Sequence, residues 1–508
     1  MQTISSLEPN GKISRIKIIA MPNNLKQAQQ LYIDGQWVDA DEGRTFSVSN
    51  PATGNPITEV ADGGEAETQR AIEAAHRAFK QWSVTPAKQR AEILKKAQQI
   101  MEERIDRIAE LVVLENGKPF AEAKGEVKFA LGYFGWFAEE SRRMYGSLVP
   151  SPFPNKRLWV QSKPLGVVAA ITPWNFPAAM MVRKIAPALA AGCTVVLKPA
   201  EDTPLTALAI AKVCHDAGVP PGVLNVIAGA NPIPISAAML NNPKVKKIAF
   251  TGSTEVGKLL MQQAAKSIKR VSFELGGNAP FIVFDDANLE VAAEEAVAIK
   301  YLRVGGQSCI CANRIYVQEN IAEQFIAAFI EKAKTLKLGV GFESGVQIGP
   351  MINEAARQKV HGLVEDAVSR GGRVALGGNY LTDDVYVSGC YYSPTVLLNV
   401  EDSWPICQQE IFGPVAPILT FKTEEEVIER ANDISFGLAG YIYTRDLGRV
   451  IRLSEALDCG LIGVNDAAGY THEIPFGGLK ESGLGREGGK QGLEEYLEVK
   501  SVVVNFSK

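Results

Sequence analysis

The segment GVVAAITPWNFPAAMMVRKIAPALAAGCTVVLKPAE, residues 166–201, contains a strand, a helix and a second strand, and this order decides the fold. The two strands, Val167–Ile171 and Thr194–Leu197, are continuous apolar runs, which are typical of strands covered on both faces. Between them, Ala178–Ala191 has the length and apolar content of a buried helix. The order predicts two parallel strands joined by a right-handed helical crossover.

The same alternation continues along the chain. Further buried strands are expected at Leu224–Ile227, Lys247–Phe250 and Arg270–Glu274, with helices at Pro204–Ala217, Ile233–Leu240 and Glu255–Ala265. We therefore predict the α/β class, with a doubly wound parallel sheet that binds ligands at the carboxyl ends of its strands. A second α/β region is expected from Asn278 to about Gly478.

The regions before and after this sheet predict helices and a protruding arm. Residues 31–38 alternate around an Asp-Gly turn and predict a hairpin, and amphipathic helices are expected over 68–82, 85–116 and 121–144. Residues 145–164 interrupt the helical pattern as a hairpin, which we interpret as an arm that reaches a neighbouring subunit. The strand 496–504 is expected to pair with it, and the polar residues 1–29 predict a flexible extension.

Composition excludes several functions. A formal charge of −4 over 508 residues, with no markedly basic half, argues against nucleic acid or an anionic membrane as a partner. The seven cysteines form no disulfide framework and favour a reducing compartment, so we expect a cytoplasmic protein. The four histidines are scattered and no CxxC pair occurs, so no metal is expected. No apolar run is long enough to span a membrane.

The stretch GGQSCICANRIYV, residues 305–317, presents Cys309 on a glycine-flanked loop. A nucleophilic thiol needs small neighbours that admit an electrophile and backbone N–H groups that stabilise an oxyanion. The alternative is that Cys309 is a small buried hydrophobic residue, which is commoner for a cysteine taken alone.

Two polar residues at predicted strand ends suit the same chemistry. Asn175, between Pro173 and Pro177, is a rigidly held amide of the kind an oxyanion donor requires. Glu274 ends an apolar strand, where burial would raise its pKa towards the range of a general base. The alternatives are an asparagine that bonds to its own turn and a glutamate in a structural ion pair.

Other strand ends favour a dinucleotide. Lys198 and Glu201 follow the second strand and suit the hydroxyls of an adenosine ribose; the alternative is an exposed ion pair at a helix start. The segment FTGSTEVG, residues 250–257, places a helix N-terminus where a pyrophosphate would bind. Glu410 and Phe412 suit a nicotinamide ribose and ring. The literal fingerprint GLGREG at residues 483–488 lacks the βαβ context, and we interpret it as a loop.

Taken together, PWNFP, KPAE, FTGSTEVG, FELGGNAP, GGQSC, EIFGP and PFGG occur in the order and spacing of the aldehyde dehydrogenase superfamily, which the chain resembles from about Leu31 to Phe506. The resemblance implies that Cys309 attacks an aldehyde to form a thiohemiacetal whose oxyanion is held by Asn175 and the Cys309 N–H. Glu274 would activate the water that hydrolyses the thioester, and Lys184 would relay protons.

The resemblance also implies a cofactor, a domain division and an oligomer. NAD is expected over NADP, because Glu201 would repel a 2′-phosphate. The implied NAD-binding domain is 30–144 with 165–276, the catalytic domain is 277–480, and 145–164 with 490–508 form the arm of a homodimer or homotetramer. The implied cofactor-binding residues are Thr172, Trp174, Lys198, Glu201, Gly229, Thr251, Gly252, Ser253, Glu410 and Phe412.

Within the superfamily the chain is most similar to succinate-semialdehyde dehydrogenases. Arg183 and Arg303 match the positions that grip the distal carboxylate, which an arginine fork suits. Phe476, Tyr470 and Thr471 would complete the pocket, and Cys311 is a candidate redox partner of Cys309.

One position departs from the pattern, because tyrosine stands at residue 470 where the family has a serine. Glutarate semialdehyde, 2-oxoglutarate semialdehyde, a sulfonated or phosphonated aldehyde and a carboxylated aromatic aldehyde are therefore alternative substrates, and His472 is a possible added cation. An enzyme that passes the acyl group to coenzyme A and a non-catalytic scaffold are the rival functions. The presence of Glu274 argues against the first, because transfer to a thiol needs no water-activating base.

Overall fold

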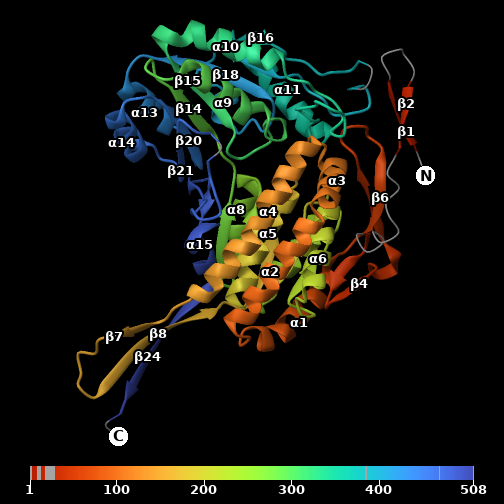
Figure 1. The fold of residues 1–508 in the computed structure, drawn as a ribbon, viewed down its shortest axis with the longest axis vertical. Helices are drawn as coiled ribbons and strands as arrows, with labels where there is room; N and C mark the ends of the chain where they lie inside the picture. Colours follow the sequence, from red (N-terminus) through yellow and green to blue (C-terminus); the bar gives the residue numbers. More distant parts are fainter. Residues whose placement is uncertain (1–2, 8–12, 18–28, 384–385, 468, 507–508) are drawn as a thin grey trace.

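The computed structural model describes residues 3–7, 13–17, 29–383, 386–467 and 469–506. This part of the chain contains two large sheets, each accompanied by helices, and a narrow three-stranded arm that projects from the body (Figure 1). The predicted α/β class is confirmed. The second sheet lies within residues 277–480, whereas the first takes one strand, β23 (Gly483–Leu484), from beyond the segments expected for its domain. The division into domains itself stays a prediction.

The first sheet has eight strands in the order β23-β13-β12-β9-β10-β11-β3-β4. Its centre consists of the five predicted parallel strands, whose ends differ from the expectation by at most two residues: β9 (Val167–Ile171), β10 (Thr194–Lys198), β11 (Leu224–Val226), β12 (Val245–Thr251) and β13 (Arg270–Glu274). Because Lys198 pairs with Ile171 and Thr251 pairs with Glu274, these strand ends lie along one edge of the sheet.

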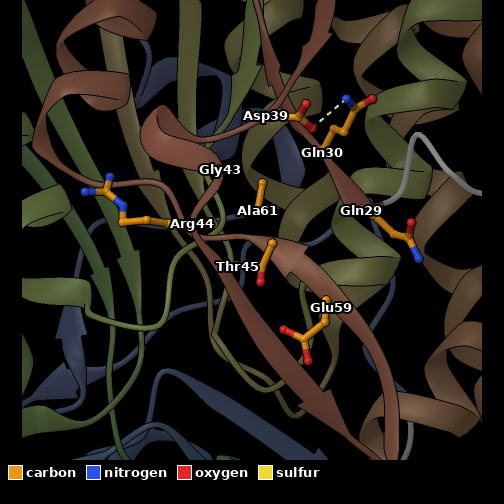
Figure 2. A pocket seen from close by; sticks show the side chains of 8 residues that line it. All are labelled: Gln29, Gln30, Asp39, Gly43, Arg44, Thr45, Glu59 and Ala61. Carbon is orange, nitrogen blue, oxygen red and sulfur yellow. Dashed lines mark hydrogen bonds between the residues drawn. The ribbon is translucent and has the colours of Figure 1, made fainter.

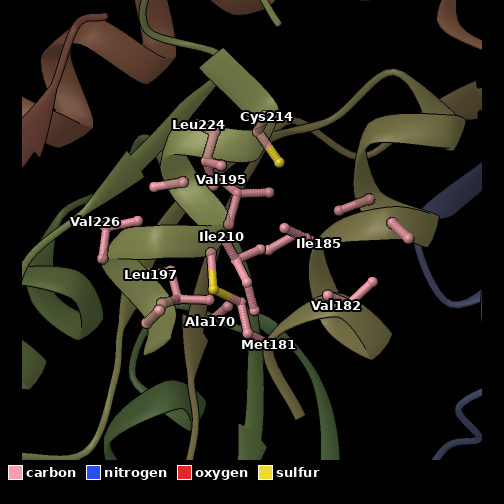
Figure 3. Packing of buried hydrophobic residues seen from close by; sticks show 14 of the residues in the cluster. Ala170, Met181, Val182, Ile185, Val195, Leu197, Ile210, Cys214, Leu224 and Val226 are labelled. Carbon is pink, nitrogen blue, oxygen red and sulfur yellow. The ribbon is translucent and has the colours of Figure 1, made fainter. Parts of the chain in front are cut away.

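The helices that join these strands are α5 (Pro177–Ala191), α6 (Pro204–Ala217), α7 (Pro232–Asn241) and α8 (Thr254–Ala265). Figure 3 shows Val182 and Ile185 of α5 and Ile210 of α6 packed beside Val195 and Leu197 of β10, all fully buried. Burying one side chain of this size stabilises the fold by about 1.5–3 kcal/mol. The core therefore fixes the strand ends that carry polar residues.

The N-terminal helices are α1 (Glu65–Trp82), α2 (Ala87–Glu103), α3 (Ile105–Asn116) and α4 (Phe120–Glu140). The prediction of one continuous helix over 85–116 was wrong, because the chain leaves helical geometry at Arg104 (φ −107°, ψ 12°). No proline or glycine marks this break. Arg104 instead makes a 2.7 Å ion pair with Asp216 of α6, and α2 and α3 both pack against α4 and α6.

The second sheet has seven strands in the order β16-β17-β18-β15-β14-β20-β21, all parallel except β16. The strands are β14 (Ala279–Val283), β15 (Ala312–Gln318), β16 (Arg373–Leu376), β17 (Thr395–Leu398), β18 (Val415–Phe421), β20 (Ala439–Tyr443) and β21 (Leu461–Val464). The accompanying helices are α9 (Leu289–Tyr301), α10 (Ala322–Lys334), α11 (Glu354–Ser369), α12 (Pro405–Gln408), α13 (Glu424–Asn432) and α14 (Leu447–Ala456).

After the second sheet the chain returns to the first. β22 (Leu479–Lys480) pairs with β19 (Phe436–Gly437), and β23 (Gly483–Leu484) then pairs antiparallel with the end of β13, directly at Glu274. A short helix, α15 (Gly489–Glu494), follows. The two predicted regions are thereby joined next to the strand end that carries the candidate base.

The predicted pairing of the C-terminal strand with the hairpin is confirmed. β24 (Leu497–Asn505) runs antiparallel to β8 (Lys156–Pro164) over nine residue pairs, and β7 (Ser147–Val149) pairs with the other edge of β8. Figure 1 shows this arm extending away from the body. Its apolar side chains Leu148, Val499 and Val503 are exposed, at 75%, 70% and 61%.

At the N-terminal side, the predicted hairpin at 31–38 is confirmed as β3 (Leu31–Ile33) and β4 (Gln36–Val38), and β5 (Thr45–Ser49) pairs with β6 (Pro56–Ala61). Within the expected flexible extension, β1 (Thr3–Leu7) and β2 (Ile13–Lys17) form an antiparallel ribbon that the sequence did not predict, and the remainder lies outside the described residues. Among the helices described, none combines the length and the apolar character needed to cross a membrane.

Candidate active site

The candidate nucleophile lies on the loop between α9 and β15. Cys309 is partly buried, and burial raises the pKa of its thiol to about 12, while the Arg183 charge acts against this rise. Gly277 lies directly under the loop, since a Cβ at this position would stand 2.1 Å from the Cys309 carbonyl oxygen. The chain that follows β13 therefore packs against the backbone of Cys309, and at residue 277 only a glycine is small enough for this contact.

Asn175 lies beside the same loop and is buried. Its Nδ2 donates one hydrogen bond to the Gln307 carbonyl oxygen at 3.0 Å, which leaves the second amide hydrogen available. The Cys309 N–H has no acceptor within hydrogen-bond range among the described residues. The Asn175 amide is thus bound to the loop that carries Cys309, two residues before the thiol, and the role of Asn175 and the Cys309 N–H as oxyanion donors stays a prediction.

Glu274 is 3% exposed at the end of β13, and its Oε2 has no hydrogen-bond partner among the described residues. Burial raises the pKa of this carboxyl well above its usual value, and the nearby Glu487 raises it further. An unpartnered, buried carboxyl with a raised pKa has the properties of a general base. The alternative of a structural ion pair for Glu274 is not found among the described residues.

Glu487 is a site residue that the sequence analysis missed. Its carboxylate forms an ion pair with Lys184 and another with Arg183, whose Nε lies 2.7 Å from Oε2. Burial acts to raise its pKa, but these two cations prevail and lower it. Glu487 lies within the GLGREG loop, which is a turn off β23 and not a βαβ unit, as predicted. The sequence signal that could have identified Glu487 is its charge within a glycine-rich loop.

The two predicted substrate arginines differ in their surroundings. Arg183 is 1% exposed, and its charge is balanced by Glu487 and stacked on the Phe476 ring at 4.6 Å, so its role in binding a carboxylate stays a prediction. Arg303 is partly exposed and donates from Nη2 to the Tyr470 hydroxyl at 3.2 Å. No carboxylate lies within ion-pair distance of Arg303 in the described part of the chain.

The loop before Phe476 is only partly arranged as expected. Tyr470 contacts Phe129 and Phe476, at ring separations of 5.2 and 5.4 Å, and so lines the site. Thr471 is exposed and bonds to Glu473. The ring of His472 stacks on Phe129 at 4.5 Å and its Nε2 donates to the Phe129 carbonyl at 2.7 Å, which binds the loop to α4. Its suggested role as an added cation stays a prediction.

The predicted adenosine side of the cofactor site lies at the ends of β9 and β10. Lys198 is 3% exposed and makes a 2.7 Å ion pair with Glu201, whose side chain is 44% exposed. The Thr172 N–H donates to the Lys198 carbonyl at 3.1 Å, so the two strand ends are tied together. An exposed carboxylate fixed by a buried lysine fits the hydroxyl pair of a ribose.

The predicted pyrophosphate side lies at the end of β12. Ser253 caps α8 by accepting from the Val256 N–H at 3.3 Å, and Gly252 donates its N–H to the Glu274 carbonyl at 3.1 Å. The buried Thr251 hydroxyl has no partner among the described residues, and a helix N-terminus suits an anion. A Cβ at Gly229 would stand 2.5 Å from the Gly63 carbonyl oxygen, so the backbone packs closely there, and the cofactor role of Gly229 stays a prediction.

The predicted nicotinamide side lies on the second region. Glu410 accepts from the Gly277 N–H at 2.9 Å, and burial raises its pKa to about 7. Phe412 has a φ of +56°, which is unusual for a non-glycine residue, and its ring meets the Trp174 ring edge-on at 5.5 Å. The structure therefore places an acid and an aromatic pair on the Gly277 side of the cysteine.

Cys311 is 1% exposed, and burial raises the pKa of its thiol. Its sulfur points to the Lys300 carbonyl at 3.7 Å, and both Cys309 and Cys311 are free thiols. A disulfide between them stays a prediction that would require the second side chain to turn.

The described residues contain no group of three or more histidine, cysteine, aspartate or glutamate side chains that could hold a metal ion. An open hollow near the N-terminal strands is separate from the site. Figure 2 shows its lining, which includes Asp39, Arg44 and Glu59 and none of the predicted site residues.

Comparison with known proteins agrees with this geometry. The family model described as the aldehyde dehydrogenase family matches residues 37–502. The chain is 50% identical to a 3-sulfolactaldehyde dehydrogenase of Pseudomonas putida, over 95% of this chain and 97% of that protein. It is 50% identical to a glutarate-semialdehyde dehydrogenase of Pseudomonas putida (94% and 98%) and 49% identical to the NADP-dependent succinate-semialdehyde dehydrogenase of Escherichia coli (94% and 98%). The crystal structure of a succinate-semialdehyde dehydrogenase from Burkholderia pseudomallei superposes with a TM-score of 0.91 at 47% identity, covering 94% of this chain and 98% of that one.

Proposed function

Because the chain belongs to the aldehyde dehydrogenase family and oxidises aldehydes, we propose that its substrate is an aldehyde with an anionic group at the far end, with succinate semialdehyde the first choice. The three relatives at about half identity are named for succinate semialdehyde, glutarate semialdehyde and 3-sulfolactaldehyde. All three aldehydes carry a carboxylate or a sulfonate, so the shared chemistry is a negative charge.

Arg303 is the observation that carries this proposal. No carboxylate of the described residues makes an ion pair with the partly buried Arg303 guanidinium, although Glu122 is near enough to act on it electrostatically. A ligand anion that bonds directly to the guanidinium would therefore lower the cost of burying this charge. Arg303 lies near enough to Cys309 to lower the pKa of its thiol, and its fork can bind a carboxylate or a sulfonate through two hydrogen bonds. An anionic substrate would therefore complete the site.

The proposed chemistry at the aldehyde uses three residues of this chain. Cys309, as thiolate, attacks the carbonyl carbon, and the oxygen that becomes negative accepts hydrogen bonds from the Asn175 amide and the Cys309 N–H. The arginine charges near the sulfur favour the thiolate against the effect of burial. A bound nicotinamide supplies the hydride acceptor, and the product on the enzyme is a Cys309 thioester.

Hydrolysis of that thioester is assigned to Glu274. Burial raises the pKa of Glu274, which makes its ionised carboxylate a stronger base for taking a proton from the attacking water. The adjacent Lys184–Glu487 pair is a buried, hydrogen-bonded route along which that proton can leave. Water as the acceptor distinguishes this function from transfer to coenzyme A.

We further propose NAD as the preferred cofactor, with NADP as the weaker alternative. With the adenosine ribose at the end of β10, Glu201 would repel a 2′-phosphate and Lys198 would attract it, so the balance within this ion pair would set the preference. The Escherichia coli relative is named for NADP, which makes the ratio worth measuring. Thr251, Ser253 and Glu410 would hold the remainder of the dinucleotide.

The test is NADH formation without coenzyme A from succinate semialdehyde, glutarate semialdehyde, 3-sulfolactaldehyde and butanal, which lacks the anionic group. The proposal expects a kcat/KM for the anionic aldehydes at least tenfold above that for butanal. Equal values would contradict it, and the order among the three anions names the substrate.

The arm supports a homodimer or homotetramer. Three apolar side chains exposed on one small sheet, Leu148, Val499 and Val503, are typical of a surface that another subunit covers. Light scattering of the wild type and of Val499→Lys/Val503→Lys tests this, with a shift to monomer expected for the variant and a monomeric wild type contradicting it. The cytoplasm remains the proposed compartment, because all seven cysteines are free thiols.

A further inference from the structure

The junction between α3 and α4 holds an unusual run of buried polar side chains, Glu115, Asn116 and Lys118, which we call the ENGK segment (Glu115–Lys118). These side chains are at most 1% exposed. Glu115 accepts from the Leu205 and Thr206 N–H groups at 2.7 and 2.8 Å, at the start of α6. Buried polar side chains are hydrogen-bonded in native proteins, so the partners of these three residues show which parts of the fold they fix.

The other two side chains of the segment hold the loop that carries Asn175. Asn116 donates from Nδ2 to the Trp174 carbonyl at 3.0 Å, and Lys118 donates from Nζ to the Asn175 carbonyl at 2.8 Å. Two consecutive carbonyls of the loop are thus bound from the same side. The Asn175 side chain is bound from the other side, through Gln307.

Further contacts hold the Lys118 ammonium in this position. Its ammonium also bonds to Glu126 Oε2 at 2.6 Å and stands 4.2 Å from the centre of the Phe176 ring. Glu126 uses its second oxygen to accept from the Ala178 N–H at 2.8 Å, at the start of α5. One ion pair therefore fixes both the Asn175 carbonyl and the helix that follows it.

We propose that Lys118 is a positioning residue for the oxyanion hole: its ammonium, fixed by Glu126, anchors the Asn175 main chain so that the Asn175 amide faces the oxygen of the Cys309 adduct. This inference rests on the oxyanion role proposed for Asn175. Lys118 does not touch the reacting atoms, and it acts only through the placement of this loop.

The physical reason is the precision that an oxyanion donor needs. Preorganised donors are effective because they do not reorganise during the reaction, and a displacement of about 1 Å can cost roughly a hundredfold in rate. Pro173 and Pro177 stiffen the loop but leave the peptide of Asn175 free to rotate between them. The hydrogen bond to the carbonyl of residue 175 removes that freedom.

The test replaces Lys118 with methionine together with Glu126→Gln, so that no unpaired charge is buried and the amide oxygen can still accept from α5. The readout is the pre-steady-state rate of NADH formation, because steady-state turnover can be limited by a later step. We expect a roughly 10- to 100-fold slower rate and a KM for the aldehyde within about threefold of the wild type. The fold is checked by thermal unfolding.

A double-mutant cycle with Asn175→Ala separates positioning from general destabilisation. If Lys118 acts through Asn175, the added Lys118→Met/Glu126→Gln change slows Asn175→Ala by less than about twofold, because the amide it positions is gone. Lys247→Met/Glu495→Gln is the matched control, since Lys247 is also buried, ion-paired to Glu495 at 3.2 Å and 5.2 Å from an aromatic ring centre. It should leave the rate unchanged.

Three results would overturn the inference. A wild-type rate in the folded Lys118→Met/Glu126→Gln protein would exclude positioning. So would a double change that slows NADH formation by the same factor in the wild-type and the Asn175→Ala backgrounds. An equal loss in the Lys247 control would assign the effect to stability. A wild-type rate in Asn175→Ala would instead remove the oxyanion role itself, and this outcome is distinct from failure at Lys118 alone.

Discussion

Replacement of Arg303 by methionine tests the proposed substrate class most directly. Methionine keeps much of the side-chain length and removes the charge. The guanidinium bonds to the Tyr470 hydroxyl and stands 5.5 and 5.9 Å from the Tyr470 and Phe176 ring centres, so it is held in place without an acidic partner in the described chain. Its charge is therefore available to a substrate anion.

The expected loss follows from this environment. Two unit charges about 4 Å apart interact by about 4 kcal/mol at an effective dielectric constant of about 20. Partial exposure of Arg303 screens part of this, and hydrogen bonds to charged groups contribute about 1.5–3 kcal/mol net. We therefore expect a loss of about 2–3 kcal/mol, or roughly 30- to 150-fold in kcat/KM for succinate semialdehyde.

The assay compares succinate semialdehyde with butanal by NADH absorbance. Butanal has the same chain length without the carboxylate, so its kcat/KM should change less than about threefold in Arg303→Met. Arg303→Lys keeps the charge and loses the two-pronged fork, and should lie between the two. Equal losses for both aldehydes, or no loss for either, would show that Arg303 does not bind the substrate anion.

Three further changes test other parts of the site. Glu487→Gln removes a negative charge beside Glu274 and leaves two cations unpaired, so the pKa of Glu274 should fall. Because a base acts only when it is deprotonated, the acid limb of the plot of kcat/KM against pH should move to lower pH. An acid limb at unchanged pH would contradict the coupling between the two carboxyls. Glu201→Gln should raise the ratio of NADP to NAD efficiency by about fivefold, because an exposed charge repulsion is worth about 1 kcal/mol, and steady-state kinetics with both cofactors measure it. Gly277→Ala places a Cβ against the Cys309 carbonyl and should lower the rate by roughly a hundredfold in a folded protein, whereas normal turnover would show that the loop can shift freely.

Local sequence patterns were sufficient to predict those features that depend mainly on a residue's neighbours in the chain. The apolar runs at β9, β10 and β13 predicted a parallel sheet, and the five strands are found within two residues of their expected ends. Cys309 and Asn175 were identified from small or rigid flanking residues, and their two loops are joined by the hydrogen bond from Asn175 to the Gln307 carbonyl. Periodicity and turn residues are properties of short segments, so they survive without tertiary information.

The sequence-based predictions missed features that depend on contacts between segments far apart in the chain. The break at Arg104 has no proline or glycine and depends on Asp216 of another helix. The packing of the His472 ring on Phe129 was likewise not predicted. Neither contact can be read from nearby residues, because each joins positions more than a hundred residues apart in the chain.

The amino-acid sequence by itself therefore determined the sheet, the order of the strand-end residues and the type of chemistry, because apolar periodicity and short motifs encode them locally. Only the tertiary structure decided which charges are balanced. Glu487 pairs with Arg183 across 304 positions of sequence, while Arg303 makes no ion pair with a carboxylate among the described residues. The free energy of a buried charge depends on its neighbours in space, and the fold alone brings those neighbours together.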